Sequence, residues 1–170
     1  MRFLTLLLML LAAPAMAAEW TVGAAPSDDP TMQAATITND DGHALFLWAR
    51  HADQRYQVFA EFHLGRGEAF GPAMPTYRID GGEITNTRDI RDKGDELGAL
   101  WAHASKDAAF WLVWTSIQDT ILPSDDLHAW FVGETIEIGY VGPDGTPKTT
   151  VFPLSGVAAA LQGATGIKTQ

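Results

Sequence analysis

The sequence contains no cysteine, and this absence removes several kinds of chemistry before any motif is considered. Disulfides, thiol nucleophiles, CxxC redox sites and thiolate metal ligands are all excluded. A lipoprotein-type anchor is excluded as well, because it requires a cysteine at the cleavage site. A folded domain of this chain must therefore be held together by its hydrophobic core alone.

Basic residues are also scarce, since 11 Lys and Arg stand against 21 Asp and Glu, a formal net charge of −10. So acidic a surface repels nucleic acid and anionic lipid at long range, and we expect neither as a partner. It suits a cationic partner or a divalent ion, although acidic charge also serves solubility alone. The composition, 46% hydrophobic and 19% charged, is that of a globular protein.

Long apolar runs are limited to one, Leu4 to Leu11, which follows Arg2 and leads to an A-x-A pattern ending at Ala17. This order of charge, apolar run and small residues predicts a signal peptide at residues 1–17, cleaved after Ala17. The run is shorter than the roughly 20 residues of a membrane-spanning helix, which disfavours a permanent anchor. We therefore expect a single β-rich domain at residues 18–170, exported to the periplasm or beyond, with no membrane insertion after cleavage.

Familiar catalytic motifs are missing: the sequence has no G-x-S-x-G, H-E-x-x-H, P-loop or G-x-G-x-x-G pattern. We therefore expect a protein that is not an enzyme and that carries no cofactor. A triad or a pair of catalytic carboxylates is defined by geometry, however, and scattered residues can assemble one. A metal-dependent or glycan-directed enzyme of the envelope accordingly stays as the alternative.

Two-residue alternation of apolar and other side chains dominates the first half of the chain. Within Tyr56 to Leu64 the even-numbered residues are apolar, whereas the other face carries Gln57, Phe59, Glu61 and His63. This pattern predicts a strand with one core face and one mixed face. Before it, Thr31–Thr38 and His43–Arg50 flank Asn39-Asp40-Asp41-Gly42, residues that tolerate the positive φ of a tight turn. We therefore predict a β-hairpin there.

Strands continue to dominate the second half. They are predicted at Thr76–Asp80, Glu83–Thr87, Leu97–Ala104, Ala108–Ser116, Glu134–Val141 and Thr149–Pro153. Arg88–Glu96 is charged and contains a glycine, so we expect a surface loop. Ala108–Trp114 is apolar on both faces, which predicts a strand buried on both sides, with Trp111 and Trp114 on opposite faces.

A short helix is expected near the C-terminus, with Ser155 as its N-cap and Gly163 at its end. No alternation of strands and helices and no internal repeat is visible. The predicted fold is therefore all-β, an antiparallel β-sandwich or barrel-like domain with a short C-terminal helix, preceded by the signal peptide.

Three features of the chain occur together: Trp20 soon after the predicted cleavage site, Tyr77-Arg78-Ile79-Asp80 in the middle, and an ending of strand, turn, strand and short helix from Glu137 to Leu161. In these features the chain resembles the invasion-associated locus B family of small exported proteins from alphaproteobacteria. The resemblance implies a periplasmic or envelope location and a β-rich, non-enzymatic domain. It supplies no active-site residues.

Glu61 and His63 are the first candidates for a binding site, because residues two apart on a strand point to the same face. A carboxylate and an imidazole there would ligate zinc or copper if a neighbouring strand supplied a third ligand. The remaining histidines are possible contributors, namely His43, His51, His103 and His128. The alternative is that Glu61 and His63 only cover the solvated face of a sheet.

Two further candidate sites follow from composition. Acidic clusters suggest calcium, although none has the EF-hand pattern and Asp is also a common turn former; they are Asp28-Asp29, Asp40-Asp41, Asp89 to Glu96 and Asp125-Asp126. Phe46 and Trp48 share a strand face with Arg50 and form a candidate ligand platform, because sugars stack on exposed aromatic rings. Most of the six tryptophans are nevertheless expected in the core.

The function expected from these observations is that of a non-catalytic periplasmic or secreted accessory protein. It would act by binding another envelope protein or a small polar ligand. A further alternative is a structural envelope protein without any ligand, which would lack a concave apolar pocket.

Overall fold

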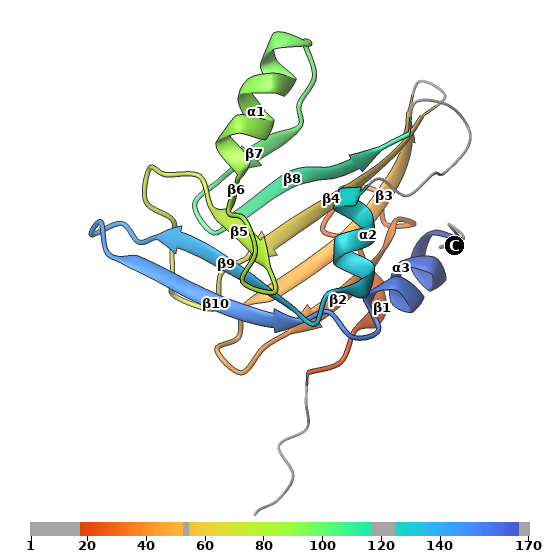
Figure 1. Ribbon diagram of the computed structural model, residues 1–170, viewed down its shortest axis with the longest axis horizontal. Coiled ribbons are helices and arrows are strands. Elements are labelled where there is room, and N and C mark those ends of the chain that lie inside the picture. The colour runs from red at the N-terminus through yellow and green to blue at the C-terminus, as the bar shows by residue number, and fades with distance from the viewer. Residues whose placement is uncertain (1–17, 53–54, 117–124, 167–170) are drawn as a thin grey trace, which may run out of the picture.

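The computed structural model describes residues 18–52, 55–116 and 125–166, and the predicted signal peptide, residues 1–17, lies outside them. The described strands form two antiparallel sheets that face each other without closing into one barrel, and a short helix follows near the C-terminus (Figure 1). The prediction of an all-β, sandwich-like fold is therefore confirmed. Across this part of the chain, no helix combines the length and apolar character needed to span a membrane.

The larger sheet has six strands in the order β1-β2-β3-β4-β8-β7, and the smaller sheet has four in the order β10-β9-β5-β6. The bounds in the larger sheet are β1 Thr21–Ala24, β2 Gln33–Thr38, β3 Ala44–Ala52, β4 Arg55–His63, β7 Ala102–Ala104 and β8 Ala108–Thr115. Those in the smaller sheet are β5 Thr76–Ile79, β6 Thr85–Asn86, β9 Thr135–Val141 and β10 Pro147–Pro153. The helices are α1 Thr87–Glu96, α2 Asp125–Val132 and α3 Val157–Thr165.

The predicted hairpin is present as β2 and β3, joined by the turn at residues 39–42. Gly42 has φ +77°, a conformation that side chains with a Cβ rarely adopt. The N–H of Gly42 donates to the carbonyl of Asn39 at 3.0 Å, and the N–H of Asn39 donates to the carbonyl of His43 at 3.0 Å. The glycine therefore sets the geometry of the turn.

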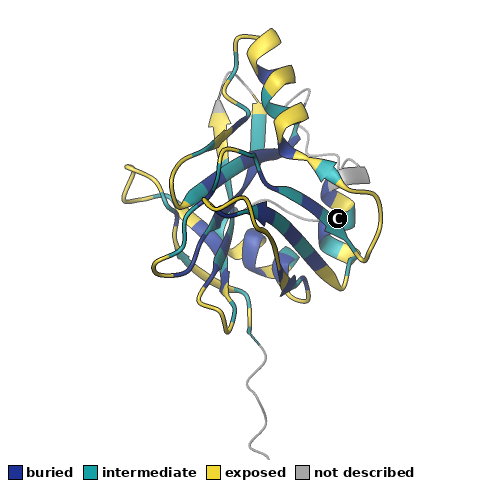
Figure 2. Cartoon of the chain, turned by 90° about the vertical axis from the view of Figure 1, so that its left-hand side faces the viewer, coloured by how far each residue is buried: buried dark blue, intermediate teal, exposed yellow. Residues whose placement is uncertain are grey.

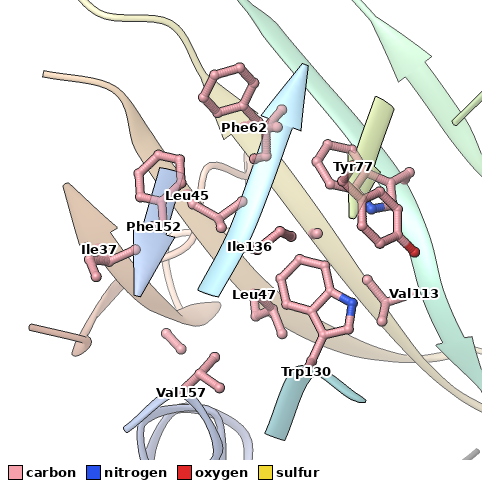
Figure 3. Close-up of a cluster of buried hydrophobic side chains, with 14 of the residues drawn as sticks. Ile37, Leu45, Leu47, Phe62, Tyr77, Val113, Trp130, Ile136, Phe152 and Val157 are labelled. Atoms are coloured by element: carbon pink, nitrogen blue, oxygen red, sulfur yellow. The ribbon is translucent and has the colours of Figure 1, made fainter. Parts of the chain in front are cut away.

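The core lies between the two sheets and is closed at one end by α2 and α3. Alternate residues of β3 and β4, such as Leu45, Leu47 and Phe62, turn inward and meet Ile136 and Phe152 from the smaller sheet (Figure 3). Trp130 of α2 is fully buried in the same cluster. Buried residues thus line the space between the layers, whereas much of the outside is exposed (Figure 2).

Strand β8 departs from simple alternation, and this corrects one prediction. Val58 of β4 pairs with Trp114 and the next residue, Phe59, pairs with Leu112, so Val113 is an extra residue in β8. Such a β-bulge changes the side to which the following residues point. Trp111 and Trp114 therefore both belong to the core cluster instead of lying on opposite faces.

The segment expected as the loop Arg88–Glu96 is instead helix α1. The side chain of Asn86 accepts a hydrogen bond from the backbone N–H of Arg88 and caps the helix, with Asp89 in the first turn and Lys93 in the last. Helix α1 has no apolar stripe of the kind used to predict helices, and it projects from the sandwich with an exposed surface (Figures 1 and 2). The predicted strand Leu97–Ala104 is correspondingly short and contains only residues 102–104.

The C-terminal helix is present, but both predicted boundaries are wrong. Gly156, with φ +91°, precedes the helix in place of Ser155, and Gly166, with φ +70°, follows it. Gly163 lies inside α3, where an added Cβ would come within 3.1 Å of Cγ2 of Val22 in β1. Close packing of the helix on the sheet accounts for that glycine. The sequence prediction also missed β1 and helix α2.

Candidate functional site

Strands β3, β4 and β8 carry a set of aromatic and polar side chains on the face of the larger sheet that points away from the core. These residues alternate with core residues such as Leu47 and Ala60 and therefore point the opposite way. We call this surface the outer aromatic face, and it comprises Phe46, Trp48, Arg50, Gln57, Phe59, Glu61, His63 and Phe110. The predicted ligand platform and the predicted metal ligands thus lie on one surface.

Glu61 lies at the centre of the outer aromatic face. Strand register places it between Phe46 of β3 and Phe110 of β8, and it is only 8% exposed. Its Oε2 accepts a hydrogen bond from Nε1 of Trp48 at 3.2 Å, and its Oε1 lies 2.8 Å from Nε2 of His63. Because an ionised carboxylate only accepts hydrogen bonds, Nε2 of His63 is the donor in this contact.

Aromatic rings surround this carboxylate. Trp48 stacks on Phe59 with ring centroids 4.6 Å apart and an angle of 17°, and Phe59 meets Phe110 edge to face at 6.0 Å. Phe46 meets His63 edge to face at 5.1 Å. Phe59 is buried beneath its neighbours, whereas the rings of Phe46, Trp48 and Phe110 are half-exposed. The half-exposed rings form a platform on which the apolar face of a ligand can stack.

A cation already lies on the outer aromatic face. The Cζ atom of Arg50 is 5.0 Å from the centroid of the Phe59 ring, within the range of a cation–π contact. The Nε of Arg50 donates to Oε1 of Gln57 at 2.8 Å, which fixes the guanidinium over the ring. The outer aromatic face therefore combines apolar rings, a carboxylate and a hydrogen-bonding rim.

Glu61 and His63 are in contact, as two ligands of one metal ion would be. Among the side chains that the structure describes, however, no three from His, Asp or Glu come together in a way that could hold an ion. The other four histidines are scattered. His43 lies inside the sandwich and His51 lies against Tyr56, whereas His103 lies beside the Phe110 ring and His128 on the surface of α2. The third ligand that the metal hypothesis requires is thus not supplied by the described residues.

The acidic clusters considered for calcium fall in turns and helices. Asp40 and Asp41 lie in the β2–β3 turn, while α1 and α2 contain the clusters at residues 89–96 and 125–126. Asp29 accepts hydrogen bonds from Oγ1 of Thr31 at 2.7 Å and from its N–H at 2.9 Å, and these bonds hold the pKa of Asp29 below its ordinary value. Asp29 therefore stabilises the turn before β2.

A second polar cluster is built around His43, which is 3% exposed. The buried N–H of Gly65 donates to Nδ1 of His43 at 2.8 Å, so Nε2 carries the proton and faces the hydroxyl of Tyr140 at 3.3 Å. That hydroxyl donates to Oε2 of Glu68 at 3.0 Å, and Nζ of Lys148 donates to the same oxygen at 3.0 Å. The buried donors from Gly65, His43 and Tyr140 each have an acceptor, and the cluster links the two sheets.

The pKa shifts of Tyr140 and Glu68 both favour the charge state that each group has at neutral pH. Burial, followed by the hydrogen bond to Glu68, raises the pKa of Tyr140 above its usual range, so the hydroxyl keeps its proton. The hydrogen bond from Lys148 holds the pKa of Glu68 below its ordinary value and outweighs the opposing effect of burial. The arrangement is that of a structural link, because Tyr140 stays neutral and Glu68 stays charged.

Two open grooves lie across the smaller sheet and beside helix α1. One of about 450 Å³ crosses β9 and β10 and is lined in part by Arg88 and Lys148. The other, of about 340 Å³, lies between α1 and β8 and includes Ile90, Trp101 and Leu112. Neither was predicted from the sequence, because each is assembled from segments that lie far apart in the chain.

The sequence prediction also missed Phe110 and the burial of Phe59 as parts of the site. Alternation along residues 56–64 already placed Phe59 beside Glu61, and this signal was available. Phe110 joins them only through the pairing of β4 with β8.

Comparisons of the chain with protein-family models, with curated proteins and with solved structures find no match. The resemblance to the invasion-associated locus B family therefore stays a prediction.

Proposed function

We propose that this chain is a non-catalytic accessory protein of the bacterial periplasm or cell surface that binds a glycan on the outer aromatic face. The location rests on the signal-peptide pattern of residues 1–17, which lie outside the described residues. The binding role rests on one observation, the half-exposed rings gathered around the carboxylate of Glu61.

The chemistry of this surface favours a sugar over a purely apolar ligand. Phe46, Trp48 and Phe110 offer ring faces and edges on which the C–H face of a pyranose can stack. Glu61, His63 and Gln57 supply acceptors and donors for hydroxyl groups on the same face of the sheet. Apolar contacts combined with a few placed polar groups are the usual composition of a small-ligand site.

The test is a titration of the protein, purified from the periplasm of an expression host, with defined oligosaccharides. Isothermal calorimetry and tryptophan fluorescence would follow binding of N-acetylglucosamine, glucosamine and maltose oligomers. Phe46→Ala removes one half-exposed ring of the platform, and we expect it to weaken binding roughly tenfold.

Val151→Ala is the matched control, because Val151 is an exposed apolar residue on β10, in the other sheet. It should leave affinity unchanged. If none of the oligosaccharides binds, the glycan proposal is wrong. Equal affinity for the Phe46 and Val151 variants would move the binding surface elsewhere.

A second candidate function is binding of an envelope protein through the end of helix α1. Leu97 and Leu100 follow that helix and are 63% and 58% exposed, which is unusual for leucine side chains close together in a chain. The double variant Leu97→Asp, Leu100→Asp would abolish such an association while leaving glycan titrations unchanged. Loss of glycan binding in this variant would count against the separation of the two surfaces.

A further inference from the structure

We propose that the outer aromatic face selects glycans that carry a primary ammonium group, as amino sugars do, and seats that group against the carboxylate of Glu61. This inference rests on the proposed glycan-binding function and names the ligand class for the same surface.

The position of Glu61 is the first ground. Phe46 and Phe110 lie directly opposite it on the two neighbouring strands, and Phe59 and His63 flank it on β4. Directly opposed residues in antiparallel strands have Cβ atoms only about 4.5–5.5 Å apart. Aromatic side chains therefore flank the carboxylate along and across the strands, in a residue that is 8% exposed.

The charge balance around Glu61 is the second ground. Burying a carboxylate is costly unless an opposite charge or several hydrogen bonds compensate it. Within the described part of the chain, Glu61 has no ion pair with a lysine or arginine, and its partners are the neutral indole N–H of Trp48 and an imidazole N–H of His63. A carboxylate accepts about four hydrogen bonds, so about two positions stay free for the hydrogens of an ammonium group.

The rings supply the third ground, because aromatic faces carry negative potential and attract cations. Arg50 demonstrates this on the same surface, with its guanidinium 5.0 Å from the centre of the Phe59 ring. That cation is held by Gln57 and is not paired with Glu61. The rings and the carboxylate of Glu61 both attract cations, and the net charge of −10 further enriches cations near the protein.

The experiment compares two tetrasaccharides of equal length, one of glucosamine and one of N-acetylglucosamine, at about pH 6.5 and low salt. Acetylation removes the charge and keeps the pyranose ring, so the pair isolates the ammonium group. We expect the exported protein to bind the glucosamine tetramer at least tenfold more tightly. Glu61→Gln, which keeps an oxygen acceptor for Trp48, should reduce this ratio to about one, because it weakens binding of the glucosamine tetramer far more than binding of the acetylated tetramer.

Glu83→Gln serves as the matched control, because it removes the same charge from an exposed residue in the β5–β6 turn. It should preserve the tenfold ratio; equal losses in both variants would show general attraction to an acidic surface and overturn the inference. Equal binding of both tetramers by the unmodified protein, which requires no variant to fold, would overturn the ammonium preference and leave the glycan function standing. Binding of neither would overturn both, and binding of tetra-lysine alone would assign the surface to a basic peptide instead.

Discussion

Replacing His43 by leucine tests whether the buried polar cluster holds the two sheets together. The imidazole accepts from the N–H of Gly65 through Nδ1 and donates to the hydroxyl of Tyr140 through Nε2. Leucine has a similar volume but offers neither function, so the buried N–H of Gly65 loses its only hydrogen-bond partner in the cluster. The hydroxyl of Tyr140 keeps Glu68 as its acceptor and is less affected.

An unsatisfied buried donor costs about 1–3 kcal/mol, and the lost bond to Tyr140 adds about 0.5–1.5 kcal/mol. We therefore expect the free energy of unfolding to fall by roughly 1.5–4.5 kcal/mol in His43→Leu. For a chain of this length the melting temperature should fall by roughly 3–18 °C.

Urea unfolding of the purified protein, followed by tryptophan fluorescence, measures this difference directly. His43→Asn retains an acceptor near the position of Nδ1 and should recover part of the loss. His103→Leu, on an exposed residue of β7, is the matched control and should change stability by less than about 0.5 kcal/mol. If His43→Leu is as stable as the control, the polar cluster around His43 contributes nothing to the stability of the fold.

Three further perturbations have defined outcomes. Gly42→Val should lower stability by at least about 1–2 kcal/mol in urea unfolding, because φ +77° disfavours a β-branched residue; unchanged stability would mean that the turn relaxes. Trp114→Ala should cost roughly 3–5 kcal/mol by the same assay, since Trp114 is 5% exposed in the core, and a loss below about 1 kcal/mol would contradict its inward orientation beyond the bulge. Because Lys148 lowers the pKa of Glu68 in the fold, the stability that this carboxylate contributes is present above its unfolded pKa of about 4.3 and is lost as the pH falls through the folded pKa. Unfolding midpoints of Glu68→Gln and the unmodified protein should therefore differ most near about pH 7 and converge towards about pH 3, and a constant difference would refute the linkage.

Most strands of the two sheets were predicted from the alternation of apolar and polar residues and from the residue types in the turns. The turn at residues 39–42 was predictable because Asn, Asp and Gly tolerate positive φ, and the φ of Gly42 agrees. Helix α1 was missed because its charged surface lacks the apolar period of three to four residues, and the capping by Asn86 is a weaker signal than that period. Trp114 was assigned to the wrong face because a bulge depends on the strand that pairs with it, which local sequence does not reveal.

The candidate site, like the fold, was predictable from the sequence only in part. By itself, the sequence determined that Phe46, Trp48 and Arg50 share one strand face and that Glu61 and His63 share another, because side chains alternate along any β-strand. Only the tertiary structure decided that these two faces are the same surface, through the pairing of β3 with β4, and that β8 adds Phe110. Strand register is set by packing of the whole core over long sequence separations, so no local pattern contains it.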